Sequence, residues 1–225
     1  MPTCYYQINR ILHMVRRSVI LSIFLLLVCC QMNAQSKDSE QLGMALEYFQ
    51  GGKYHEAMLL LEKLDRHYNL NPRYKAYLGV CYYYEWEFKK TTECLDSLLP
   101  KLEVFAPHER SVYYYTNAES HFNLGQYSQS IPLYEKTLTV CFENEKAEVY
   151  YRLGFCYLFE KRWQESYDSF EQSYDYYQRY FPDQQGRIDQ IVNMMAGLQE
   201  EHHLNEPAPS DHLSDTLHVE VTPQL

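Results

Sequence analysis

Between residues 38 and 182 the pattern of hydrophobic and polar residues repeats along the chain. Pairs of stretches carry apolar residues at helical spacing, and a short polar turn separates the two members of each pair. The pattern predicts antiparallel helix pairs at about 38–71, 72–107, 109–142 and 147–180, which together fill a region from 36 to 182.

Each pair contains four recurring positions, and the copies are spaced by 34, 39 and 36 residues. These positions are a first small residue (Ala45, Gly79, Ala118, Gly154), an aromatic residue that opens the second helix (Tyr54, Phe88, Tyr127, Trp163), a second small residue (Ala57, Thr91, Ser130, Ser166) and a large residue (Leu61, Leu95, Tyr134, Phe170). Small side chains let two helices approach closely, while large neighbours fill the space beside the crossing.

This unit resembles the tetratricopeptide repeat (TPR), a helix–turn–helix motif of about 34 residues. The resemblance, to TPR proteins of the exported bacterial type, implies an all-α, right-handed superhelical solenoid with an extended concave face. The sequence departs from the pattern at Trp86, which replaces the turn glycine seen at Gly52 and Gly125. It also departs between Pro100 and Pro107, where copy two carries five extra residues.

After the fourth copy, an apolar stripe predicts a capping helix within residues 183–204. The stripe contains Ile188, Ile191, Val192, Met195 and Leu198. Solenoids need such a cap because the last repeat otherwise exposes its core. Residues 205–225 have three prolines and no Lys or Arg, so they are expected to form a flexible tail. Within this tail Leu217, Val219 and Val221 alternate with polar residues, and the tail is one candidate ligand for the concave face.

Residues 1–35 have the pattern of a secretory signal peptide. Two arginines precede an apolar run over 19–28, and a small-residue cleavage site ends before Gln35. The run is too short to span a bilayer as a helix. Residues 1–13 are a possible mis-called start. The sequence thus predicts an exported protein, periplasmic or envelope-associated. The alternative is a membrane-anchored lipoprotein with lipid on Cys29 or Cys30.

Composition argues against several classes of function. Removal of residues 1–35 takes away three arginines and no acids, which leaves 17 basic and 30 acidic residues and a net charge of −13. Such a charge disfavours nucleic acid and anionic membranes as partners. The chain has no phosphate-binding glycine loop, nucleophile elbow or paired-cysteine metal site, so we expect no enzyme activity, cofactor or metal.

A few side chains have alternative interpretations. Cys81, Cys94, Cys141 and Cys156 lack metal-type spacing and are interpreted as small buried residues, with a Cys81–Cys94 disulfide left open. His121 occupies the position of Tyr48, Tyr82 and Tyr157 in the other copies, which favours a packed histidine over a pH-sensitive one. His202 and His203 follow two glutamates, a pattern that a solvated helix end explains as well as a metal site does.

The leading hypothesis is a non-catalytic interaction module or scaffold of the cell envelope. The alternative is an accessory subunit of an envelope enzyme or transport complex. The resemblance implies a concave groove lined by Leu42, Leu46, Phe49, Ala76, Val80, Tyr83, Tyr115, Glu119, Phe122, Tyr151, Phe155 and Leu158. These residues lack the Lys, Arg and Asn of the family's peptide-carboxylate clamp, so an apolar helix or extended segment is the expected ligand. Tyr115 and Phe155 are the expected anchors, although some of these residues could instead be core.

The mature protein is expected to begin at or near Gln35 and to fractionate outside the cytoplasm, because the apolar run and the small-residue site form a cleavable signal. Mass spectrometry of the N-terminus is the measurement. An intact segment 19–28 recovered from a membrane pellet would contradict cleavage and indicate an anchor.

Overall fold

The computed structural model describes residues 37–202 and divides the chain into two compact units, one ending at Gln126 and one beginning at Tyr127. All regular secondary structure in this range is helical, which confirms the predicted all-α fold. No helix in the same range is long and apolar enough to cross a bilayer. The signal-peptide and tail predictions (1–35 and 205–225) lie outside the described residues.

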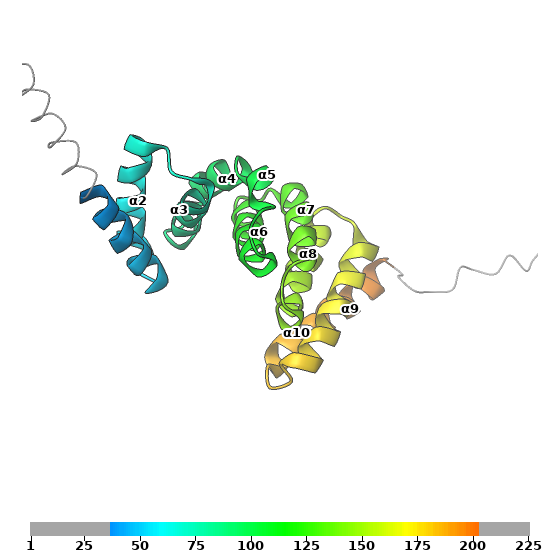
Figure 1. Cartoon of the computed structure of the whole chain (residues 1–225). Helices are drawn as coiled ribbons and strands as arrows, with labels where there is room; N and C mark the ends of the chain where they lie inside the picture. The colour runs from blue at the N-terminus through cyan, green and yellow to red at the C-terminus, as the bar shows by residue number, and fades with distance from the viewer. Residues whose placement is uncertain (1–36, 203–225) are drawn as a thin grey trace, which may run out of the picture. The chain divides into compact units, whose positions relative to one another are not determined.

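Unit 1 consists of consecutive helices joined by short turns (Figure 1). They are a first helix over residues 37–50, α2 (Tyr54–Tyr68), α3 (Pro72–Tyr84), α4 (Phe88–Asp96), α5 (Leu99–Leu102) and α6 (Pro107–Asn123). α3 packs against α2 and α4, and α6 packs against α4 and α3. Pro72 and Pro107 each start a helix, where the missing N–H of proline costs no hydrogen bond.

Unit 2 repeats the arrangement and ends with an additional helix. Its elements are α7 (Tyr127–Leu138), a 3₁₀ turn (Glu143–Glu145), α8 (Lys146–Phe159), α9 (Trp163–Tyr180) and α10 (Gln185–His202). α8 packs against α7 and α9, and α10 packs against α9. Pro132 lies inside α7. The helix α10 therefore covers the last helix of copy four, as expected of a cap.

The second helix of copy two is shorter than its counterparts. α4 ends at Asp96, and the extra residues of this copy form the four-residue helix α5 and the segment before α6. Leu102 of α5 is fully buried, so the insertion contributes to the core rather than forming an exposed loop.

Glycine permits the closest helix crossings within each unit. A Cβ atom on Gly79 would lie 2.7 Å from the Leu95 side chain, and one on Gly154 would lie 2.6 Å from the Phe170 ring. Ser166 adds a hydrogen bond at the second crossing, since its Oγ donates to the Gly154 carbonyl at 2.8 Å. The small and large positions of the repeat are all buried, while the opening aromatics are half-buried. The columns recognised in the sequence are therefore the packing positions of the helix pairs.

The turn between the two helices of a copy has one geometry throughout. Its central residue is left-handed in every copy: Gly52 (φ 72°), Trp86 (φ 64°), Gly125 (φ 72°) and Lys161 (φ 59°). In copy two, Trp86 N–H donates to the Tyr83 carbonyl at 3.0 Å and Glu87 N–H to the Tyr82 carbonyl at 2.9 Å. These two bonds define a Schellman helix end, which favours glycine. Trp86 and Lys161 keep the geometry although a side chain makes this conformation unfavourable.

A recurring hydrogen bond joins each copy to the preceding one within a unit. An aromatic residue on the first helix donates to a carboxylate on the second helix of the copy before it. The pairs are Tyr82 with Glu62 (3.0 Å), His121 with Asp96 (3.2 Å) and Tyr157 with Glu135 (2.9 Å). The six residues occupy equivalent positions in the repeat, so the same polar contact fixes the register of successive copies.

Replacement of Gly154 with alanine is expected to destabilise the protein by about 1–3 kcal/mol, because the new methyl group would overlap the Phe170 ring. Gly197→Ala is the matched control. Its Cβ would meet nothing within 4 Å, so it should instead stabilise α10 by up to about 1 kcal/mol. Urea denaturation of both variants measures the difference. Equal changes in the free energy of unfolding for the two variants would refute a close helix crossing at Gly154.

Candidate functional site

In unit 1 the expected groove residues of the first helix and α3 fall into two groups. Ala76 and Val80 are core residues with almost no exposed surface. The half-buried members are Leu42, Leu46, Phe49 and Tyr83. The Phe49 ring stacks on Tyr77 with centroids 4.5 Å apart, so part of its surface is already used inside the unit.

On α6, Glu119 is buried, whereas Tyr115 and Phe122 are half-buried. A buried carboxylate side chain offers a partner no accessible charge. Of the three expected groove residues on this helix, therefore, Tyr115 and Phe122 retain surface that a ligand could contact.

In unit 2 the expected groove residues of α8 belong to the hydrophobic core beneath α10. Tyr151 is buried with Ile188 and Ile191 of α10, and the Arg187 guanidinium lies 3.9 Å from the centre of its ring. Phe155 and Leu158 pack against the same core, and both are half-buried. The cap thus occupies much of the surface that the resemblance assigned to a ligand in copy four.

A cluster of aromatic rings surrounds the left-handed turn of copy two. We call it the turn patch and define it as Tyr54, Tyr83, Tyr84, Trp86 and Phe88. Tyr54 stacks on Tyr84 with centroids 3.9 Å apart and planes 3° apart, and Tyr83 contacts both Tyr84 (5.3 Å) and Phe88 (5.9 Å). Trp86 lies 6.0 Å from Phe88. Trp86 is 77% exposed and Tyr84 is 49% exposed, so the patch presents apolar surface to solvent.

Charged residues border the turn patch. His55 Nδ1 lies 2.7 Å from the Glu85 carboxylate, and Lys90 Nζ lies 3.5 Å from Glu87. An apolar centre with a polar margin is the usual composition of a protein interaction surface. The sequence contains one signal of this site, a tryptophan in a position where two other copies have glycine.

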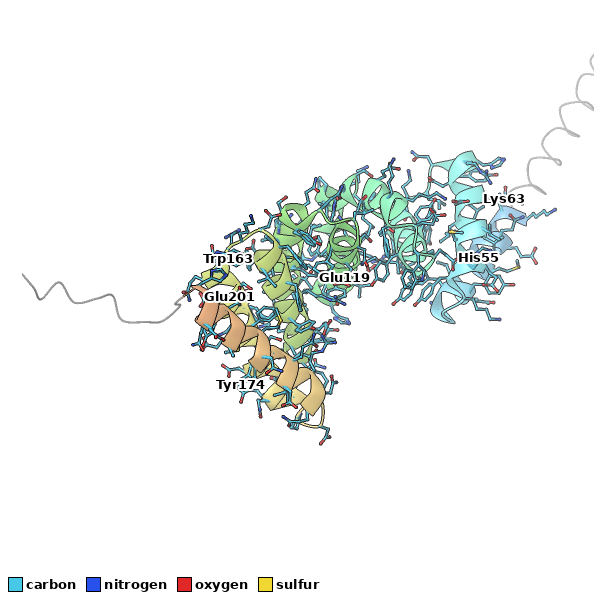
Figure 2. The ribbon with its side chains drawn as sticks, turned by 180° about the vertical axis from the view of Figure 1, so that it is seen from behind. His55, Lys63, Glu119, Trp163, Tyr174 and Glu201 are labelled. Carbon is cyan, nitrogen blue, oxygen red and sulfur yellow. The ribbon has the colours of Figure 1, made fainter. Side chains whose placement is uncertain are left out.

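The turns of unit 2 contain related ring pairs. Tyr127 stacks on Phe159 with centroids 4.5 Å apart, and Trp163 stacks on His202 at 4.1 Å. Figure 2 shows Trp163 beside the end of α10, where Glu201 is labelled. In both pairs, as in Tyr54 with Tyr84, the aromatic residue that opens a second helix packs on the end of the next helix in line. The ring of His202 therefore has a packing role.

Comparisons with known proteins agree with this geometry. Solved structures of MamA, a TPR-repeat protein, superpose on the chain. A structure of the AMB-1 protein has a TM-score of 0.53 and 17% identity over 76% of this chain and 94% of its own. The protein from Desulfovibrio magneticus RS-1, from residue 41 to its end, has a TM-score of 0.51 and 14% identity over 76% and 98%.

The chain has the TPR fold. No protein-family model matches the sequence, and no curated protein matches it. At such low identity the structural similarity supports the fold and carries no information on ligands.

The cysteines of the TPR copies are buried or half-buried. None of Cys81, Cys94, Cys141 and Cys156 forms a disulfide with another described residue, so Cys81 and Cys94 are not joined. Burial raises the pKa of Cys81 to about 12 and those of Cys94 and Cys141 to about 11, which leaves little thiolate at neutral pH. Among residues 37–202 no group of three or more His, Cys, Asp or Glu side chains is placed to hold a metal ion.

Tyr82, His121 and Tyr157 each form the hydrogen bond that links a copy to the preceding one. Of these three, His121 is the residue whose side chain ordinarily titrates near neutral pH. Its Nδ1 lies 2.7 Å from Gln126 Oε1 and its Nε2 lies 3.2 Å from Asp96 Oδ1, so both ring nitrogens face acceptors. Asn117 Nδ2 also donates to Asp96, at 2.7 Å. Burial alone would lower the pKa of His121, but the bonds to Asp96 and Gln126 outweigh it and raise that pKa.

The pKa of Asp96 shifts in the opposite direction. Burial opposes its ionisation, yet the hydrogen bonds from His121 and Asn117 hold the pKa of this carboxyl below its usual value. The ion pair therefore contributes most between the lowered pKa of Asp96 and the raised pKa of His121.

His121→Tyr, which introduces the residue found in copies two and four, should remove this pH dependence. A raised histidine pKa stabilises the fold fully below the unfolded-state value of about 6.5 and stops doing so as pH rises through the folded-state pKa. The wild-type free energy of unfolding should therefore fall relative to that of the variant as pH rises from about 6 to 8. Urea titrations across this range measure it. If the difference in unfolding free energy between wild type and variant stayed constant across this pH range, it would contradict a charged His121.

Proposed function

We propose that this protein is a non-catalytic scaffold that binds an apolar segment of a protein partner through the turn patch. The observation that supports this most strongly is Trp86, a large apolar side chain exposed on a left-handed turn. A side chain in this conformation costs roughly 1–2 kcal/mol relative to a right-handed one. Residues in unfavourable conformations cluster at functional sites, where the side chain has a use that offsets the strain.

The chemistry of the patch suits an apolar helix or extended segment. Tryptophan and tyrosine are the residue types most often found as energetic anchors in protein interfaces. Tyr83 belongs both to the patch and to the groove inferred from the TPR resemblance. Tyr54 of the patch lies 5.7 Å from Phe49, so a ligand on the patch would continue along the first helix toward Phe49 and Leu46. The proposed site therefore extends the expected groove to the edge of copy two.

The proposed setting is the cell envelope. The signal-peptide pattern of residues 1–35 supports export, with lipid attachment at Cys29 or Cys30 as the alternative. The acidic composition supports a protein partner over nucleic acid or an anionic membrane.

Trp86→Gly provides a sharp test, because glycine suits the left-handed turn while it removes the proposed anchor. The partner is first captured by cross-linking to the intact protein in its own cells and identified by mass spectrometry. Its affinity for the variant is then measured by calorimetry. We expect a loss of roughly 2 kcal/mol, about thirtyfold, together with an unfolding free energy that is unchanged or raised by up to about 1 kcal/mol.

Lys161→Gly is the matched control. Lys161 occupies the same turn position of copy four with φ 59°, so the substitution should stabilise the fold similarly and leave partner affinity unchanged. Unchanged affinity in folded Trp86→Gly protein would place the binding surface elsewhere. An equal loss of partner affinity in both variants would show that the effect comes from the turn backbone and not from the Trp86 side chain.

A further inference from the structure

The five extra residues of copy two have no counterpart in the other copies. Insertions in repeat proteins map to loops on one face of the array, which is often the binding face. Here the inserted helix α5 packs on α3. A cleft of about 380 Å³ lies there, lined by residues 71–74 at the start of α3 and by Lys101, Val104 and Phe105 of the insertion. We call it the insertion cleft, and its volume lies in the range of ligand sites.

Contacts within unit 1 hold the insertion in place. Leu102 is fully buried, and Glu103 accepts a hydrogen bond from Arg110 at 2.7 Å. The ring of Phe105 packs edge-on against Tyr113 with centroids 6.2 Å apart. The cleft therefore exists before a ligand binds, so that binding costs little ordering of the protein.

The insertion cleft is cationic in an acidic protein. None of its lining residues is acidic, although the whole chain has 30 acidic and 20 basic residues. Arg73 is already paired, since its Nε and Nη2 contact the Glu109 carboxylate at 2.9 and 3.1 Å. Lys101 is exposed and has no carboxylate partner among residues 37–202. A cleft lined by charge of one sign attracts the opposite charge, so this one favours an anion.

The lining favours a carboxylate beside an apolar group. The guanidinium fork of Arg73, the group best suited to phosphate, is occupied by Glu109, which leaves the single charge of Lys101. The Arg73 guanidinium lies 4.8 Å from the centre of the Phe105 ring, and Val104 is 82% exposed. One unpaired cation therefore lies beside apolar surface.

A row of aromatic rings connects the insertion cleft with the turn patch. In order, with centroids 6.2, 4.5, 5.7 and 3.9 Å apart, the rings are Tyr74, Tyr77, Phe49, Tyr54 and Tyr84. Each of them is half-buried or exposed. Tyr74 of the cleft and Tyr84 of the patch are ten residues apart on α3. That separation is about 15 Å along the helix axis, which about five residues of extended peptide would span.

We propose, on the basis of the proposed function of the turn patch, that the insertion cleft binds a carboxylate of the same partner segment. The carboxylate pairs with Lys101 Nζ, and an apolar side chain next to it contacts Phe105 and Val104. The rest of the segment lies along the ring row toward Trp86. The partner thus carries Asp or Glu about five residues from the apolar residue that contacts Trp86.

Two synthetic peptides with blocked termini test the proposal on the purified full chain. Each contains alternating leucine and serine over a length that spans the ring row, with glutamate at both ends of the acidic peptide and glutamine at both ends of the neutral one. Because the protein is acidic, its overall charge favours the neutral peptide. We nevertheless expect calorimetry to show a preference of roughly threefold for the acidic peptide, the strength of a partly exposed ion pair.

Lys101→Gln should abolish this preference and leave the affinity for the neutral peptide unchanged, because the lysine is exposed and has no carboxylate partner among residues 37–202. Lys63→Gln is the matched control. Lys63 of α2, labelled in Figure 2, is also exposed, forms no ion pair within residues 37–202 and does not line the cleft. Its replacement removes the same charge and should keep the preference.

Octanoate separates a peptide site from a site for small organic acids. It joins a carboxylate to an apolar chain but is too short to reach the turn patch. We expect it to bind at least about tenfold more weakly than the acidic peptide, because it makes none of the contacts along the ring row. Equal affinity would assign the cleft to small acids and overturn the peptide assignment.

Equal affinities of the wild-type protein for the two peptides, or no binding of the acidic one, overturn the proposal. A preference that survives Lys101→Gln, or that Lys63→Gln also removes, does the same. Trp86→Gly tests the turn patch separately, since it should weaken both peptides by the same factor and keep the preference. If Trp86→Gly changes neither affinity, the turn patch is refuted, while loss of the preference in Lys101→Gln still supports the insertion cleft.

Discussion

The close approach of paired helices is the constraint on which this fold depends. At Gly79 and Gly154 the missing side chain lets Leu95 and Phe170 lie where a Cβ atom would otherwise be. Because the backbones lie close together, one large residue fills the space at each crossing. This residue and the buried residues around it form the core of each copy. Glycine, which has no Cβ atom, is thus essential at two crossings. At the equivalent position of copy one, alanine is small enough (Ala45).

A thin double layer of helices leaves few positions fully away from water, and this explains the abundance of tyrosine. Its ring contributes to the narrow core while its hydroxyl reaches the surface. There the hydroxyl repeatedly donates to a carboxylate, as in Tyr82 with Glu62, Tyr157 with Glu135 and Tyr177 with Glu148 (2.6 Å). Within residues 37–202, tyrosines and acidic residues are therefore paired in the packing of the copies.

A comparison of equivalent positions in the four copies separates structural from functional residues. A residue that matches its counterparts in burial and contacts, such as Tyr157, is explained by the stacking of copies. A residue that departs from them needs another explanation. Trp86 departs by placing a bulky side chain on a turn where two other copies have glycine. This departure supports the proposed partner site at the turn patch.

The sequence by itself determined the helix pairs, because the small and large positions of a crossing recur at fixed spacing and need no distant information. It did not determine which groove residues stay accessible. Tyr151 and Phe155 lie on the expected face, but the packing of α10 buries the first and half-covers the second, and that packing depends on contacts between distant segments. The turn patch likewise required the tertiary structure, since Tyr54 stacks on Tyr84 across thirty residues. Local periodicity specifies the repeat, whereas exposure is a property of the assembled copies.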